Sequence, residues 1–184
     1  MSSAVLIQPG ASPVVAIAQP EPCWYAAQTH ARAEKKAVTQ LQGKGVETFL
    51  PTVKEIHRWS DRRQVVEVAM LPGYAFVRAV LTPQTRLKVL QTFGVTSFVS
   101  FGGEIPSIPD QQIEEIRLLS ENNIGCSETP FIRLGQRVRV LGGCLEGLEG
   151  ILVSRHGEKA LVLSIDSIQR SISIAVGDYT LERI

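Results

Sequence analysis

The segment that most constrains the fold of this chain is Met70–Val77, where a Pro-Gly pair leads at once into a β-prone run. Proline fixes φ and glycine accepts a positive φ, so Pro72-Gly73 predicts a tight turn directly before a strand. Alternation along that strand puts Tyr74 and Phe76 on one face, and part of the segment must therefore be core. Leu71, at the turn, is predicted to be exposed. We expect an apolar contact surface at this point of the molecule.

Basic residues gather in the segment before this block. Between His30 and Arg63 the sequence holds eight Lys or Arg and four Asp or Glu, whereas the whole chain has a net charge of +1. A local excess of positive charge can follow phosphates, and a solvated helix face is the alternative explanation. Contact with nucleic acid at this segment is thus one of two interpretations.

The sequence contains no catalytic or metal-binding pattern. Its three cysteines and three histidines are scattered, without a Cys-x-x-Cys pair or metal-ligand spacing. Gly102-Gly103 and Gly142-Gly143 are typical of hairpin turns and do not match a phosphate loop. We therefore expect no enzyme, no cofactor and no metal. Unpaired thiols are typical of the reducing cytoplasm.

The first 22 residues are rich in Ala, Val and Pro. Pro9, Pro13 and Pro20 interrupt their apolar runs well short of a membrane span, and no basic region precedes them. We expect residues 1–22 to be a mobile tail without membrane contact. Nothing in the sequence explains why this tail is apolar.

Two structural units are expected after the tail. In residues 23–122, strand-like runs alternate with three helix-like segments, which is typical of an α+β domain. The helices are predicted to begin at Thr29, at Thr82-Pro83 and at Asp110, where capping residues precede apolar residues at helical spacing. Residues 123–131 have the composition of a flexible linker.

Residues 132–184 form the second unit. Five short strands recur near residues 137–141, 149–155, 159–166, 169–175 and 179–183, separated by Gly-containing or polar turns. Closure of such strands removes exposed sheet edges, so the spacing predicts a small β-barrel.

The ordered pair of units resembles the NusG family of transcription elongation factors from Trp24 to Ile184. The first unit is similar to the family's NGN domain, an antiparallel sheet with flanking helices, and the second to its KOW domain, an SH3-like β-barrel. A single KOW-like stretch is weakly specific, but an NGN-like unit followed by a KOW-like unit is highly specific. The matching stretches are Trp24-Tyr25, Glu34-Lys35, Leu71 to Val77, Gly94-Val95, Phe98-Val99, Val138-Arg139-Val140, Gly142-Gly143, Gly147 and Gly150-Ile151.

The resemblance implies a partner and a mode of action. NGN domains dock an apolar patch on the clamp helices of the largest subunit of RNA polymerase, and the complex then resists pausing. The matching positions here are Leu71, Pro72, Tyr74 and Phe76, residues of a kind that anchors interfaces. Burial in the core is the alternative for part of this motif.

The resemblance also implies a DNA contact. In members that pause at a specific DNA element, polar and basic positions of the first helix and a second turn touch the exposed non-template strand. The basic residues would neutralise phosphates and Phe93 would stack on a splayed base, with burial of Phe93 in the core as the alternative. The positions concerned are His30, Arg32, Lys36, Gln40, Thr92 and Phe93, together with Arg62 and Arg63 of the basic hairpin.

Departures from the housekeeping pattern indicate a specialised paralogue. The last hairpin of the barrel carries Ile168-Gln169-Arg170 where general members have a Phe-Gly-Arg-like turn. Arg58–Arg63 and Phe101–Pro106 look closer to the RfaH, UpxY and LoaP type, which acts on particular long operons. The KOW partner, Rho or a ribosomal protein, stays open. A housekeeping factor and a ribosome-associated RNA-binding protein are the alternatives, although seven basic and six acidic residues in 132–184 disfavour the second.

Overall fold

The computed structural model describes residues 21–58, 63–129, 135–155 and 158–184. Apart from Glu21 and Pro22, the predicted tail lies outside these ranges, as do the hairpin tip with Arg62 and residues 130–134. The elements up to residue 121 are β1 (Cys23–Thr29), α1 (Glu34–Gly43), β2 (Glu47–Phe49), β3 (Thr52–Arg58), β4 (Arg63–Ala69), β5 (Tyr74–Ala79), α2 (Pro83–Leu90), β6 (Val95–Phe98) and α3 (Asp110–Glu121).

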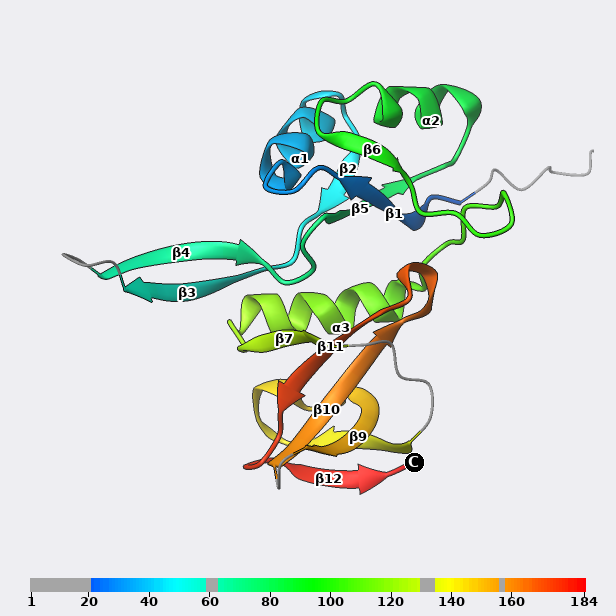
Figure 1. The fold of residues 1–184 in the computed structure, drawn as a ribbon. Helices are drawn as coiled ribbons and strands as arrows, with labels where there is room; N and C mark the ends of the chain where they lie inside the picture. The colour runs from blue at the N-terminus through cyan, green and yellow to red at the C-terminus, as the bar shows by residue number, and fades with distance from the viewer. Residues whose placement is uncertain (1–20, 59–62, 130–134, 156–157) are drawn as a thin grey trace, which may run out of the picture.

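The amino-terminal part is built on an antiparallel sheet in the order β2-β5-β1-β6. Helices α1 and α2 lie over one face and α3 lies on the other (Figure 1). Strand β5 is therefore internal and covered on both faces, so Ala75, Phe76 and Val77 are all buried. The predicted α+β architecture is confirmed, while the expected alternation of buried and exposed residues is absent from β5.

One of the three predicted helix starts is confirmed. Thr82 caps α2, accepting a hydrogen bond from the Thr85 amide at 3.1 Å, and Pro83 is the first helical residue. Thr29 does not cap α1: it is the last residue of β1, and its amide donates to the carbonyl of Gly73. Asp110 lies inside the first turn of α3, where its charge favours the helix dipole, and Pro109 precedes it.

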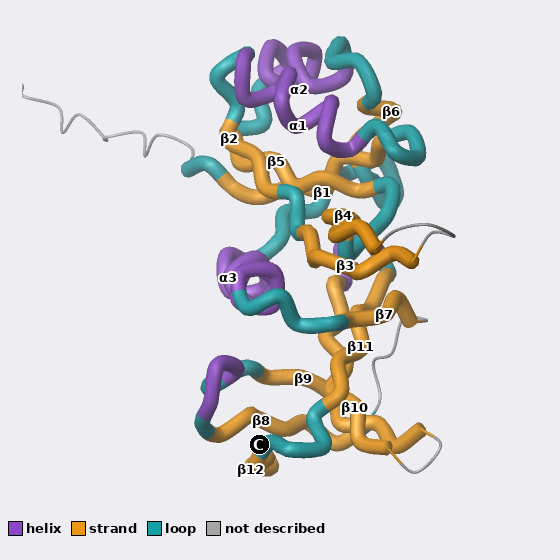
Figure 2. Tube along the Cα trace, turned by 90° about the vertical axis from the view of Figure 1, so that its left-hand side faces the viewer, coloured by secondary structure: helices purple, strands orange, loops and turns teal. Residues whose placement is uncertain are grey.

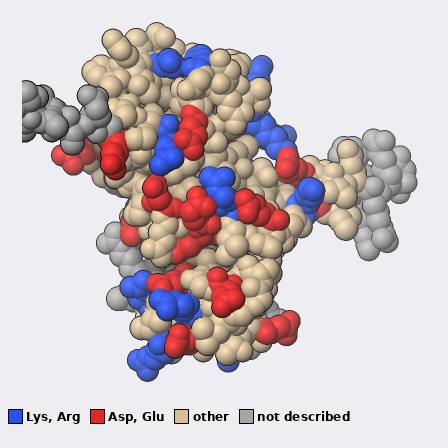
Figure 3. Space-filling view, turned by 180° about the vertical axis from the view of Figure 1, so that it is seen from behind, with Lys and Arg blue, Asp and Glu red and all other residues tan. Residues whose placement is uncertain are grey.

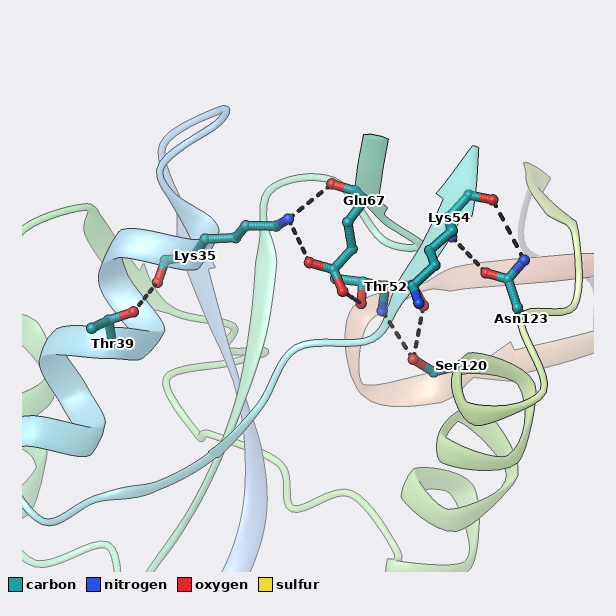
Figure 4. Close-up of polar contacts among 7 residues, drawn as sticks. All are labelled: Lys35, Thr39, Thr52, Lys54, Glu67, Ser120 and Asn123. Carbon is teal, nitrogen blue, oxygen red and sulfur yellow. Dashed lines mark hydrogen bonds and ion pairs between the residues drawn. The ribbon is translucent and has the colours of Figure 1, made fainter. Parts of the chain in front are cut away.

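Strands β3 and β4 form a separate two-stranded ribbon that projects from the body of the molecule (Figure 1). Polar contacts fix its base (Figure 4). The Ser120 hydroxyl donates to the carbonyl of Thr52 at 2.8 Å, and the Asn123 side chain accepts from the Lys54 amide at 2.6 Å. Lys35 of α1 pairs with Glu67 of β4 at 2.7 Å, so α1 and α3 both hold the ribbon.

The carboxy-terminal part is a six-stranded antiparallel sheet in the order β12-β8-β9-β10-β11-β7. The five predicted strands are confirmed. Its elements are β7 (Cys126–Thr129), β8 (Gln136–Leu141), the short helix η1 (Gly143–Leu145), β9 (Glu149–Arg155), β10 (Glu158–Ile165), the short helix η2 (Asp166–Ile168), β11 (Arg170–Ala175) and β12 (Thr180–Arg183).

Strand β7 corrects the expectation of a flexible linker over 123–131. It pairs with β11 from Cys126↔Ile174 to Thr129↔Ser171, and so satisfies backbone groups that an edge strand would leave unpaired. The two parts also share an apolar cluster, in which α3 supplies buried Ile113, Ile116 and Leu119. The carboxy-terminal sheet therefore packs on the amino-terminal part through α3 (Figures 1 and 2).

Candidate functional site

The Leu71–Val77 motif is mostly part of the core. Leu71 is 1% exposed and Phe76 is fully buried, with the Phe76 ring stacked on Phe49 at a centroid distance of 6.1 Å. The prediction that Leu71 is an exposed contact is wrong in this structure, because the chain bends before the turn and directs Leu71 into the apolar cluster between sheet and α3. Core burial, the alternative for part of the motif, holds for both residues.

The turn at Pro72-Gly73 is the exposed part of the motif. Gly73 has φ +82°, which favours glycine, and the Tyr74 amide donates to the carbonyl of Leu71 at 3.2 Å. Two contacts hold the turn from below. The Gly73 amide donates to Glu34 Oε1 and the Thr29 amide donates to the Gly73 carbonyl, both at 2.8 Å. Glu34 is a buried carboxylate, so the turn is fixed rigidly with Pro72 facing solvent.

Tyr74 connects the motif to the carboxy-terminal part. Its phenol group hydrogen-bonds the Arg170 side chain, at the start of β11, and this contact together with Glu128 raises the pKa of Arg170. Arg170 also pairs with Glu128 of β7 at 2.6 Å. Because Tyr74 is half-buried beneath these residues, any partner that docks on its ring has to displace Arg170.

The predicted nucleic-acid residues lie around the amino-terminal end of α1. His30, Arg32 and Lys36 are exposed, and Gln40 is half-buried. Arg32 has φ +63°, an uncommon conformation for a residue with a side chain. The His30 amide donates to the Gly94 carbonyl at 2.9 Å, so this segment is bound to the turn that carries Phe93.

Phe93 is 63% exposed, and the alternative that it belongs to the core is wrong. Lys36 Nζ lies 4.4 Å from the centre of its ring, so a cation and an open aromatic face adjoin. Thr92, by contrast, is buried: its hydroxyl accepts from Lys44 Nζ at 2.7 Å and donates to the Lys88 carbonyl at 3.0 Å. Thr92 therefore joins α1 to α2, and a direct contact with a ligand is excluded in this conformation.

The structure thus brings two surfaces together. Thr29 and His30, neighbours in sequence, bind the carbonyls of Gly73 and Gly94 respectively, so the Pro72-Gly73 turn and the Phe93-Gly94 turn are attached to consecutive residues. Gly94 is required there, because a Cβ atom would lie 3.1 Å from that of Ala33. Arg63 begins β4, but its side chain, like all of Arg62, is outside the described structure.

Sequence reasoning missed Glu34 and Lys44 as residues that shape these surfaces. Glu34 belongs to a matching stretch, but only the fold shows that its carboxylate reaches the amide of Gly73. Lys44 looked like one more solvated cation until the fold placed it on Thr92. Contacts of this kind join residues about 40 positions apart and leave no local signal.

Two further findings bear on chemistry. Among the described residues, no group of three or more His, Cys, Asp and Glu could hold a metal ion, and no helix is long and apolar enough to span a membrane. The thiols of Cys23, Cys126 and Cys144 are free, and burial raises the pKa of Cys126 to about 11. Cys126 is therefore a poor nucleophile near neutral pH.

Known proteins resemble this chain over most of its length. The family profile described as "Transcription termination factor nusG" matches residues 22–117, just over half of the chain. The transcription termination/antitermination protein NusG of Borreliella burgdorferi is 25% identical over 182 residues, covering 88% of this chain and 98% of that protein. NusG of Staphylococcus carnosus is 25% identical, covering 88% and 95%.

A solved structure shares the fold. It is entitled "Domain interaction in Thermotoga maritima NusG" and aligns with a TM-score of 0.50 at 19% identity, over 89% of this chain and 98% of that one. At this identity the likeness concerns the fold, and it extends through both parts of the molecule.

Proposed function

Because the chain belongs to the NusG family of transcription termination/antitermination factors, we propose that it binds RNA polymerase and suppresses pausing or termination on particular operons. The observation that carries this proposal is the exposed Pro72-Gly73 turn, held by Glu34 and attached through Thr29-His30 to the Phe93 turn. A rigid apolar turn suits a protein partner, and the adjoining Lys36–Phe93 pair suits a nucleic acid.

We propose that Pro72 and the edge of Tyr74 make the polymerase contact, with the clamp helices of the largest subunit as the partner surface. Leu71 and Phe76 would support that contact from beneath, since both are buried. His30, Arg32, Lys36 and Phe93 would face the non-template DNA strand, with Gln40 at the margin. This division assigns protein binding to one turn and DNA binding to the other.

Substitution at Pro72 tests the polymerase contact. Pro72→Asp puts a charge on the exposed turn without altering a buried side chain, and should weaken binding of the full-length protein to purified cognate polymerase by at least about tenfold. Pro22→Asp is the matched control, an exposed proline before the opposite end of β1. Equal binding by wild type, Pro72→Asp and Pro22→Asp would remove this turn from the interface.

Arg170 offers a second test, because it bonds Tyr74. If polymerase docks on Tyr74, Arg170→Ala should strengthen binding, since one contact that competes with the partner is lost. Glu128→Gln weakens the ion pair of Arg170 while leaving the Tyr74 contact, and should change binding less. Weaker binding by Arg170→Ala would mean that Arg170 itself contacts the polymerase.

A housekeeping role is the competing function, and it fits the family equally well. The Arg170 contact favours specialisation, because it engages the Ile168-Gln169-Arg170 turn with the amino-terminal part of the same chain. Mapping the occupancy of the tagged protein along the genome decides between the two. Signal confined to a few long operons supports the operon-specific function, and signal on most transcribed genes supports the housekeeping one.

A ribosome-associated RNA-binding role is less well supported. Acidic and basic side chains are interspersed over the face of the molecule seen in Figure 3, without a broad region of one sign. On the carboxy-terminal part, Arg137 and Arg139 both pair with Glu149, which offsets their charge. Such a surface attracts phosphates weakly.

A further inference from the structure

Two hollows meet where the amino-terminal and carboxy-terminal parts come together. The first, of about 580 Å³, lies between the segment that includes Phe101, Pro106 and Pro109 and the turn that carries Ser167 and Gln169. We call it the interdomain groove. The second, of about 500 Å³, is lined by Glu21 and Cys23 at the start of the described chain and shares Ser107 and Pro109 with the groove. The groove is therefore continuous with the point at which residues 1–20 enter the structure.

The groove combines apolar walls with an unsatisfied polar group. Phe101 is 49% exposed, a large fraction for an aromatic ring beside two prolines. Ser167 is 93% buried, and its hydroxyl has no hydrogen-bond partner among the described residues. A buried hydroxyl without a partner is costly, so an occupant that offers backbone donors or acceptors would be stabilised there. Gln112 and Gln169 add further side-chain amides to the lining.

The chain itself contains a segment of matching chemistry. Residues 1–20 carry no Asp, Glu, Lys or Arg, and Val14-Val15-Ala16-Ile17-Ala18 is an apolar run that begins seven residues before Glu21. Seven residues can span roughly 23–25 Å when extended, which suffices to cross the second hollow and enter the groove. Extension would put Val15 and Ile17 on one face and leave backbone groups free to meet Ser167.

We propose that Val14–Ala18 of this chain occupies the interdomain groove and binds both parts of the molecule at once. The segment contacts Phe101, Pro106 and Pro109 on one side and the Ser167–Gln169 turn on the other. Its function is to hold the carboxy-terminal part against α3. This accounts for an apolar amino-terminal segment that the proposed transcription function leaves unused.

Hydrogen exchange on the full-length protein tests this placement. The variant V14S/V15S/I17S removes the apolar side chains and should speed exchange about tenfold in peptides covering residues 101–112 and 164–170, because both walls lose cover. The matched control V5S/L6S/I7S, in the more distant apolar run, should exchange like wild type. Unchanged exchange in the first variant, or an equal rise in the control, would overturn the assignment.

Photo-crosslinking identifies the occupant directly. A photoreactive amino acid at position 16 of the full-length chain should capture residues 101–112 or 166–169 of the same molecule. Capture of α2, where Leu87 and Leu90 are exposed, would place the segment elsewhere and refute the proposal. Capture between two chains would show that a second copy fills the groove, which also refutes it.

Discussion

Phe93 is an unusual residue at the smallest scale, because a large apolar ring is held in solvent by its own backbone. The turn is fixed by the buried Gly94, by Thr92 beneath and by the His30 amide, so the ring cannot fold into the core. Lys36 lies over one face of the ring. A fixed aromatic with a neighbouring cation is suited to stacking on an unpaired base.

Replacement of this ring should affect nucleic-acid binding specifically. We expect Phe93→Ala to weaken binding of single-stranded DNA about tenfold, as the loss of one stacked base implies, without lowering protein stability. Fluorescence anisotropy with a labelled oligonucleotide at fixed salt measures this effect. Phe101→Ala, at another exposed phenylalanine, serves as the control and should bind like wild type. Equal losses in both variants would indicate non-specific apolar contact.

Residue-level predictions from sequence succeeded where the chemistry is local and failed where burial decides. The basic character of the α1 region and the turn at Pro72-Gly73 follow from residue type alone. Leu71 and Thr92 were both expected at a surface, yet each is buried by segments distant in sequence. A turn residue is exposed or buried according to what packs above it, and that information lies in α3 and in Lys44.

At the scale of elements, Asn123 links α3 to the β3–β4 ribbon. It has φ +51°, and its side-chain amide faces both backbone groups of Lys54, at 2.6 Å for the Lys54 amide and 3.5 Å for its carbonyl. Asparagine tolerates this backbone conformation better than most residues. The side chain therefore substitutes for a neighbouring strand at the base of the ribbon.

Two substitutions separate the backbone role of Asn123 from its side-chain role. Asn123→Gly keeps the backbone conformation and loses the contacts with Lys54, and should lower the free energy of unfolding by about 1 kcal/mol. Asn123→Ala also forces an alanine into positive φ, and should cost about 1 kcal/mol more. Urea unfolding measures both. An alanine variant as stable as the glycine variant would show that the backbone conformation relaxes.

Element boundaries were predicted from sequence in proportion to the local signal. Thr82-Pro83 announced α2 because both cap and proline act within one turn. Strand β7 was taken for linker because its four residues, Cys126–Thr129, have no apolar alternation and become a strand only beside β11. Strand pairing between distant segments is not encoded in either segment alone.

At the scale of the whole molecule, Glu115 marks the cost of packing the two parts together. It lies on α3 in a hollow shared with Arg137, Glu149 and Ile151 of the carboxy-terminal sheet. Burial is the main cause that raises its pKa, and the Glu149 charge adds to it, while Gln111 and Arg137 act in the opposite direction. A carboxyl with a raised pKa in the folded state favours folding when protonated, and this contribution is lost as the pH rises through its folded pKa.

Removing that charge should therefore stabilise the protein at neutral pH. We expect Glu115→Gln to raise the free energy of unfolding at pH 7 by less than about 1 kcal/mol, because the side chain is only partly buried. The gain should shrink toward pH 4, where the wild-type carboxyl takes up a proton. Glu114→Gln is the matched control: Glu114 is exposed on the same helix and pairs with Arg117 at 3.3 Å, so its loss should not stabilise the fold. Urea unfolding across this pH range compares the three proteins. A Glu115→Gln variant no more stable than wild type at pH 7 would mean that α3 and the carboxy-terminal sheet separate readily in solution, and that the contact between Tyr74 and Arg170 opens with them.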